Sequence, residues 1–204
     1  MKILNLYAGI GGNRKLWKGH EITAVELNPE IAKIYQEFYP NDKVIVTDAH
    51  AYLLEHFKEY DFIWSSPPCQ THSIMNYSIS KDENKKGNPL KIRYPDMNLY
   101  QEIILLTQHC VNKWVIENVK PYYKELVKPM IYLDRHFFWS NFIIYPIEIK
   151  SNRKHSEIKA GSTIYNVNIK EKNINNKIQL LRNMVNPEIG KYILDQSMYT
   201  GELF

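Results

Sequence analysis

The sequence is poor in cysteine, and this excludes several classes of protein. Of its 204 residues only Cys69 and Cys110 are cysteines, and they lie far apart in the chain. Two distant thiols do not make the dense disulfide framework of small secreted domains, and they lack the paired spacing of zinc ligands. A reducing compartment is therefore expected, and no metal site is predicted.

Long apolar runs are also missing. No stretch approaches the roughly 20 apolar residues that a membrane-spanning helix needs. The chain opens directly on a strand-like segment, Lys2 to Leu6, without the basic leader and apolar stretch of a signal peptide. With 44% hydrophobic and 24% charged residues, a soluble, cytoplasmic globular protein is expected. The net charge of +4 allows a polyanionic partner without requiring one.

Short apolar runs alternate with helix-like stretches over the first two-thirds of the chain. Helices are predicted from the N-cap signal Asn28-Pro29-Glu30 and over residues 98–110, with an amphipathic stretch at residues 14–17. The runs that predict strands are residues 3–7, 22–26, 44–46, 60–64 and 113–116. This alternation predicts an α/β fold with a mostly parallel sheet covered by helices on both faces.

Five polar residues lie at or just after the predicted strand ends. They are Asn5, Glu26, Asp48, Cys69 and Glu117. Because ligands of such sheets bind beyond the carboxyl ends of the strands, these residues are predicted to share one site.

A glycine-rich turn follows the first predicted strand. Gly9, Gly11 and Gly12 allow a tight turn and a close backbone approach to a ligand, but their spacing departs from the dinucleotide fingerprint. The turn alone fits a dinucleotide, a methyl donor or no ligand. Glu26 is placed to bind ribose hydroxyls and Asp48 an adenine amino group, although both could be solvated strand-end carboxylates.

The segment Ser65-Ser66-Pro67-Pro68-Cys69-Gln70 is the strongest chemical signal. Consecutive prolines present the next side chain on a stiff loop, and a thiolate can add to C6 of a pyrimidine. A lone cysteine is more often a small buried hydrophobe, and that role is assigned to Cys110, at the end of an apolar helix. Glu117 could hold a cytosine and, if its pKa is raised, protonate N3.

Together these motifs resemble the cytosine-C5 methyltransferase family, in the expected order and over nearly the whole chain. Leu6 to Gly12 resembles the methyl-donor loop, Pro67 to Gln70 the nucleophile motif, Glu117 to Val119 the base-holding motif and Arg182 to Pro187 the last motif. The resemblance implies a Rossmann-like methyltransferase fold with S-adenosylmethionine as cofactor. The implied cofactor-binding residues are Tyr7, Ala8, Gly9, Gly11, Gly12, Glu26, Leu27, Asp48, Ala49, Ser66, Asn183 and Val185. The implied catalytic residues are Cys69, Glu117 and Arg135, and the implied substrate-binding residues are Pro68, Gln70 and Asn118.

Three departures from the family pattern stand out. Asn5 replaces the usual Asp, and the arginine motif is matched only by Arg135. The usual target-recognition domain is missing, which divides the chain into a catalytic core (1–141), a reduced recognition segment (142–179) and a return to the core (180–204). Basic residues of a long polar loop, 71–95, and of residues 150–172 are expected to contact phosphates.

The resemblance implies methylation of C5 of a cytosine flipped out of double-stranded DNA, through a covalent bond between Cys69 and C6. A homodimer or an accessory protein could complete target recognition. A tRNA cytosine methyltransferase and a non-catalytic S-adenosylmethionine- or DNA-binding relative are the alternatives. An amino-methyltransferase needs no thiol after Pro-Pro, and a nicotinamide dehydrogenase is disfavoured by the glycine spacing.

Overall fold

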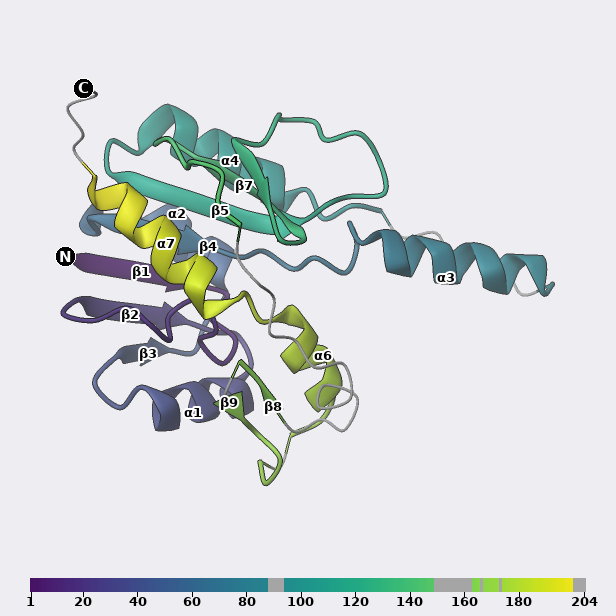
Figure 1. Cartoon of the computed structure of the whole chain (residues 1–204), viewed down its shortest axis with the longest axis horizontal. Helices are drawn as coiled ribbons and strands as arrows, with labels where there is room; N and C mark the ends of the chain where they lie inside the picture. The colour runs from purple at the N-terminus through teal and green to yellow at the C-terminus, as the bar shows by residue number, and fades with distance from the viewer. Residues whose placement is uncertain (88–93, 149–162, 166, 173, 200–204) are drawn as a thin grey trace.

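A seven-stranded sheet forms the centre of the molecule in the computed structural model (Figure 1). The structure describes residues 1–87, 94–148, 163–165, 167–172 and 174–199. The sheet strands are β1 (Lys2–Leu6), β2 (Glu21–Val25), β3 (Lys43–Ile45), β4 (Phe62–Ser65), β5 (Lys113–Val119), β6 (Ile131–Leu133) and β7 (His136–Ser140). The other elements are α1 (Pro29–Phe38), α2 (Ala49–His56), η1 (Phe57–Glu59), α3 (Ile74–Lys85), α4 (Asn98–His109), β8 (Thr163–Ile164), β9 (Val167–Asn168), α6 (Lys177–Asn183) and α7 (Pro187–Met198).

The strand order is β3-β2-β1-β4-β5-β7-β6, and the first five strands in this order are parallel. Only β7 runs against its neighbours β5 and β6. The chain leaves β1 toward β2 on one side and later returns to β4 on the other, so the strand order reverses between β1 and β4. Such a switch point opens a crevice at the carboxyl ends of the two strands.

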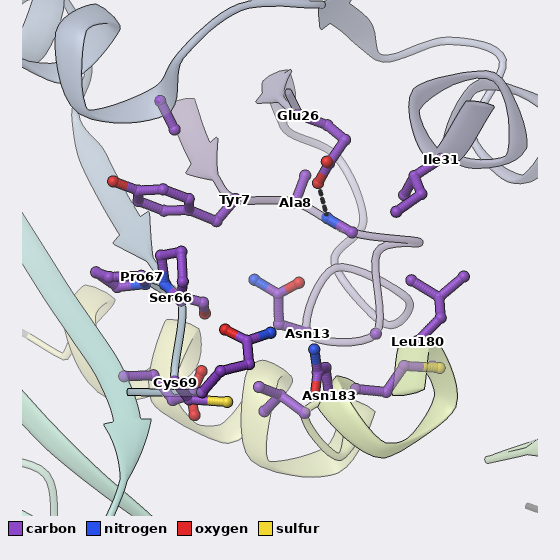
Figure 2. A pocket seen from close by; sticks show the side chains of 18 of the residues that line it. Tyr7, Ala8, Asn13, Glu26, Ile31, Ser66, Pro67, Cys69, Leu180 and Asn183 are labelled. Carbon is purple, nitrogen blue, oxygen red and sulfur yellow. Dashed lines mark hydrogen bonds between the residues drawn. The ribbon is translucent and has the colours of Figure 1, made fainter. Parts of the chain in front are cut away.

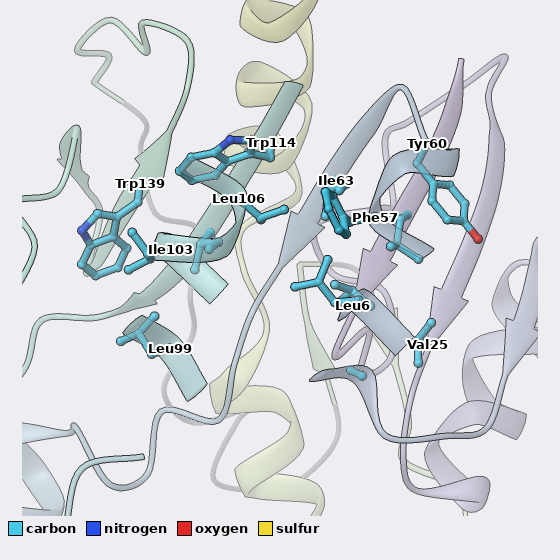
Figure 3. Packing of buried hydrophobic residues seen from close by; sticks show 14 of the residues in the cluster. Leu6, Val25, Phe57, Tyr60, Ile63, Leu99, Ile103, Leu106, Trp114 and Trp139 are labelled. Atoms are coloured by element: carbon cyan, nitrogen blue, oxygen red, sulfur yellow. The ribbon is translucent and has the colours of Figure 1, made fainter. Parts of the chain in front are cut away.

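Helices cover both faces of the sheet, which confirms the predicted fold class. On one face α2 and α4 pack over the side chains of alternate strand residues, and Leu53 and Leu106 belong to one buried cluster with Leu6. Figure 3 shows Leu106 and Leu6 in this cluster. On the other face α7 packs through Ile189 and Ile193 onto Trp64 and its neighbours. The strands are apolar on both sides because each side faces a helix layer.

Helix α7 returns the C-terminal part of the chain to the glycine-rich turn. Gly190 packs directly on the backbone of Asn13, because a Cβ added at Gly190 would lie 2.2 Å from the backbone carbonyl oxygen of Asn13. The indole nitrogen of Trp17 donates to the Gly190 carbonyl at 3.0 Å. Residues 14–16 form turns rather than the helix-like stretch that amphipathicity indicated, and the Trp17 side chain that follows is buried against α7.

The predicted long loop 71–95 is wrong over its first half. Residues 74–85 form α3, which projects away from the sheet (Figure 1). Its apolar side chains, such as Met75 and Ile79, are exposed, so the helix buries no apolar stripe that periodicity could reveal. Near its start the Tyr77 ring stacks on that of Tyr122, with centroids 4.4 Å apart.

The predicted recognition segment, 142–179, is described only in part. Its short β8–β9 hairpin packs through Val167 and the following Ile169 against the α1 and α6 side of the core. Of the basic residues expected to contact phosphates, Lys81, Lys85 and Lys86 are exposed on or beside α3, whereas Lys172 pairs with Glu37. Lys91, Arg93, Lys150, Arg153, Lys154, His155 and Lys159 lie outside the described residues.

Among the helices that the structure describes, none has both the length and the apolar character needed to cross a bilayer.

Candidate functional site

A cavity of about 440 Å³ opens at the switch point between β1 and β4 (Figure 2). Sixteen of the eighteen site residues predicted from the sequence line it, and the other two are Gly11 and Asn118. The additional lining residues include Ile10, Asn13, Asn28, Ile31, Pro67, Asp96, Asn98, Val119, His136, Leu180, Arg182 and Met184. One cavity therefore contains both the glycine-rich turn and the cysteine segment.

The turn after β1 is held in an unusual backbone conformation. Tyr7 and Gly9 have φ angles of 53° and 54°, in the left-handed region. The Gly9 amide donates to Oε2 of Glu26 at 2.9 Å, and the Asn28 amide donates to Oε1 of the same carboxylate. Glu26 thereby fixes the turn and also lines the cavity, and each oxygen of a carboxylate can accept a further hydrogen bond. An added Cβ at Gly9 would meet no atom within 4 Å, so open space lies beside this turn.

The other two glycines of the turn serve packing. An added Cβ at Gly11 would lie 2.3 Å from the Tyr39 ring, and one at Gly12 would lie 2.8 Å from the Val185 carbonyl oxygen. Gly12 therefore lets the last motif, with Asn183 and Val185, approach the turn closely. Gly11, predicted to bind a cofactor, packs against Tyr39 instead of lining the cavity.

Asp48 and Ala49 bring the start of α2 to the cavity wall. Asp48 is the N-cap of this helix, and its Oδ1 accepts from the Ala51 amide at 2.8 Å. Leu27 is 65% exposed at the rim. Both carboxylates predicted at strand ends, Glu26 and Asp48, thus line the cavity while also bonding to backbone amides.

The cysteine segment leaves β4 and crosses the cavity. Asn118 donates from Nδ2 to the Pro67 carbonyl at 2.9 Å. It therefore fixes the backbone of the cysteine segment without lining the cavity. The Cys69 carbonyl accepts the amides of His72 and Ser73, both at 3.1 Å. Burial, together with the nearby Glu117 carboxylate, raises the pKa of the Cys69 thiol to about 11, against the opposing influence of Arg135. Cys110, by contrast, is half-buried at the end of α4 and packs against the core.

Glu117 lies inside β5 rather than just after it, because the strand continues to Val119. The extension pairs with the antiparallel β7, where Glu117 faces Phe138. Burial raises the pKa of Glu117 to about 7, although the Ser66 hydroxyl and Arg135 favour its charged form. Oε1 of Glu117 lies 3.3 Å from Nε2 of the buried His136. A carboxyl group that is partly protonated near neutral pH therefore shares the cavity with a thiol.

Arg135 connects the β6–β7 turn to the last motif. Its Nη2 donates to the Arg182 carbonyl and lies 3.4 Å from the Met184 carbonyl oxygen. The guanidinium still lines the cavity and acts electrostatically on Cys69 and Glu117. His136, next to it, was missed by the sequence reasoning. A histidine in an otherwise aromatic strand, beside the expected arginine, is the signal that could have indicated it.

The raised pKa of Glu117 has a consequence for stability. The native pKa lies above the ordinary value of 4.5, so ionisation opposes folding and its cost develops as pH rises from about 4.5 to about 7. We expect Glu117→Gln to raise the free energy of unfolding by up to about 3 kcal/mol at pH 8, with no such gain at pH 4. Urea unfolding of both proteins at the two pH values measures this. A variant that is less stable than the wild type at pH 8 would contradict it.

Comparison with known proteins identifies the family. The model of the C-5 cytosine-specific DNA methylase family matches residues 1–128. A tRNA (cytosine(38)-C(5))-methyltransferase from Spodoptera frugiperda is 26% identical over an alignment of 158 residues, which covers 71% of this chain and 44% of that protein. The chain thus spans less than half the length of this relative.

Two solved structures superpose on this chain with low TM-scores. Spodoptera frugiperda DNMT2 is 27% identical, with a TM-score of 0.40 over 61% of this chain and 37% of the other. A methyltransferase from Entamoeba histolytica is 16% identical, with a TM-score of 0.43 over 82% of this chain and 61% of the other. At these scores the superpositions add nothing to the assignment that the family match provides. On that match, the chain belongs to the C-5 cytosine-specific DNA methylase family, whose cofactor is S-adenosylmethionine.

Proposed function

We propose that this chain transfers a methyl group from S-adenosylmethionine to C5 of a cytosine in DNA, with Cys69 as nucleophile and Glu117 as acid. The observation that carries the proposal is that one cavity is lined by the Cys69 thiol, by the Glu117 carboxyl with its raised pKa, and by the glycine-rich turn that Glu26 holds. This combination matches a reaction that needs a nucleophile, a proton donor and a bound cofactor.

The cavity fits S-adenosylmethionine on the side of the glycine-rich turn. An aromatic ring (Tyr7), the open space beside Gly9 and the carboxylates of Glu26 and Asp48 line this side. Tyr7 would pack on the adenine, Glu26 would accept from the ribose hydroxyls and Asp48 from the adenine amino group. When bound, the cofactor supplies an electrophilic methyl group.

The chemistry of the other side follows from the residues there. The Cys69 thiolate would form a bond to C6 of the cytosine while Glu117 gives a proton to N3. The electron pair of the C5–C6 double bond then forms a C4–C5 double bond, the C4–N3 pair takes the proton, and C5 becomes the nucleophilic carbon of an enamine. C5 would then take the methyl group as the bond between the methyl carbon and the sulfonium sulfur breaks, which leaves S-adenosylhomocysteine. A base removes the C5 proton, the S–C6 bond breaks, and N3 returns its proton to Glu117. The target cytosine must first leave the helical stack, as the substrates of other enzymes that modify a nucleobase do.

A second candidate substrate is tRNA. It is favoured by the similarity to the Spodoptera frugiperda tRNA methyltransferase and by the small size of the segment between residues 142 and 179. With so few residues for reading a sequence, a second copy of the chain or an accessory protein would complete recognition of DNA.

One assay separates the two substrates. The protein is incubated with S-adenosylmethionine tritiated in its methyl group and with either duplex DNA or tRNA, and the product nucleosides are separated. We expect label in 5-methylcytosine from DNA. Label in tRNA alone would transfer the proposal to the second substrate, and label in neither would overturn it.

A further inference from the structure

Helix α4 carries a carboxylate that is completely buried. Glu102 is 0% exposed, and a buried carboxylate is tolerated only when its oxygens are hydrogen-bonded. Oε1 accepts from the Tyr7 hydroxyl at 2.7 Å and lies 3.1 Å from Nδ1 of His50. Oε2 accepts from the Ser65 hydroxyl at 2.6 Å. Every partner comes from a different element.

These partners lie in or next to three of the segments that form the cavity wall. Tyr7 opens the glycine-rich turn after β1, Ser65 ends β4 just before the cysteine segment, and His50 follows Asp48 and Ala49 at the start of α2. Glu102 itself does not line the cavity. It contacts the wall from the side away from the cavity. Its hydrogen bonds add to the pairing of Leu6 with Ser65 at the ends of β1 and β4, and they connect the start of α2 to these strand ends.

We propose that Glu102 is a positioning residue of the S-adenosylmethionine site, which orients the Tyr7 ring and fixes the turn after β1 relative to the start of the cysteine segment. This inference rests on the proposed function, because it assumes that the cofactor binds against Tyr7.

The backbone of Tyr7 shows why such a support is needed. Tyr7 has a φ of 53°. Residues other than glycine rarely adopt this backbone conformation, and it persists only when surrounding contacts impose it. The hydroxyl bond to Glu102 is such a contact, and it lies at the far end of the ring. Figure 2 shows the ring along the cavity with its hydroxyl pointing away from Cys69. Burial and Glu102 together raise the pKa of Tyr7, so the hydroxyl remains a donor.

A purely structural role for Glu102 makes a different prediction, and Tyr35 supplies the matched control. The Tyr35 hydroxyl donates to Oδ2 of Asp42 at 2.8 Å in a buried pair of the same kind, but neither residue lines the cavity. Tyr35→Phe and Tyr7→Phe each remove one hydroxyl donor from a buried carboxylate, and only the second changes a residue that lines the proposed cofactor site.

Binding of S-adenosylhomocysteine, measured by isothermal titration calorimetry, tests the inference without a nucleic acid. We expect Tyr7→Phe and Glu102→Gln each to weaken binding by about tenfold or more, as loss of a hydrogen bond to a buried charge does. Tyr35→Phe should bind within about twofold of the wild type while losing similar thermal stability. The double variant Tyr7→Phe/Glu102→Gln should bind about as weakly as Glu102→Gln alone, because both changes remove the same interaction.

Two outcomes would overturn the inference. One is wild-type affinity in Tyr7→Phe, and the other is an equal loss of affinity in Tyr35→Phe. If Glu102→Gln fails to fold, the comparison of the two tyrosine variants still decides. A wild-type protein that does not bind S-adenosylhomocysteine would instead refute the proposed function. A wild type that binds it but labels no nucleic acid would refute only the proposed substrate.

Discussion

Replacing Cys69 by serine should lower methyl transfer by about three orders of magnitude or more, which corresponds to about 4 kcal/mol of lost transition-state stabilisation. The hydroxyl is nearly the same size as the thiol, so the Pro67–Pro68 loop and its bond to Asn118 should persist. What is lost is nucleophilicity, because an alcohol does not ionise near neutral pH and adds poorly to C6. The effect is measured as incorporation of tritiated methyl groups into the nucleic acid that the wild type labels in the assay described above.

The second cysteine provides the matched control. Cys110 lies half-buried at the end of α4, with its Sγ 3.6 Å from the Asn112 carbonyl oxygen. Cys110→Ser should retain activity within about twofold, because the residue is remote from the cavity and its change is a small packing effect. Binding of S-adenosylhomocysteine should be unchanged in both variants, which separates loss of chemistry from loss of fold.

The covalent step can be observed directly. Fluorine at C5 cannot leave as a proton does, so 5-fluorocytosine in the nucleic acid should trap the Cys69 adduct as a species stable to denaturing electrophoresis. The adduct should form with the wild type and with Cys110→Ser and be absent from Cys69→Ser. Methyl transfer by Cys69→Ser above one-tenth of the wild-type rate would refute the nucleophile assignment.

Sequence patterns predicted only some of the elements that pack on the core. They gave no prediction for α2, β6 and β7, although these also bury apolar side chains there. The parallel strands and helices α1 and α4 all bury an apolar face, which gives their residues a visible period. Helix α3 was missed because Met75 and Ile79 are exposed and the helix projects from the sheet. The extension of β5 through Glu117 could not be seen either, since it depends on pairing with the distant β7.

The candidate site divides in the same way. Cys69 and Glu26 follow directly from local motifs, whereas the roles of Gly11 and Asn118 depend on Tyr39 and Pro67, which come from other segments. Glu102 left one signal in the sequence that was not used. It shares a helix face with the buried Leu99 and Leu106, and an acidic residue on such a face implies buried partners.

The second prediction concerns the pH dependence of the reaction. With a Glu117 pKa of about 7 and a Cys69 pKa of about 11, the reactive form has the carboxyl protonated and the thiol ionised. Between these two pKa values the dominant form has a neutral thiol and a charged carboxylate. The two forms hold the same number of protons and differ only in which group carries one, so their ratio does not change with pH. We therefore expect kcat/KM to rise tenfold per pH unit below about 7 and to remain level from pH 7 to 9.

Glu117→Gln should change the shape of this profile as well as its height. Without a proton to give to N3, the variant should be slower at pH 7 by about two to four orders of magnitude. Its rate should then follow thiol ionisation alone and keep rising through pH 7 toward 9. Loss of the carboxylate charge also lowers the Cys69 pKa toward its ordinary value of 9.0, since Glu117 is one cause of its elevation.

The contrast between a level and a rising profile tests the pairing of the two groups. If Glu117 had only a structural role, Glu117→Gln would lower the rate without changing the slope of the profile, because ionisation of Cys69 would be the same titration in both proteins. Rates are measured from pH 5.5 to 9 at a fixed high cofactor concentration, with the same nucleic acid for both proteins. A wild-type rate that climbs tenfold per unit above pH 7 would show that Glu117 does not supply the proton and would leave Cys69 as the only titrating group of the reaction.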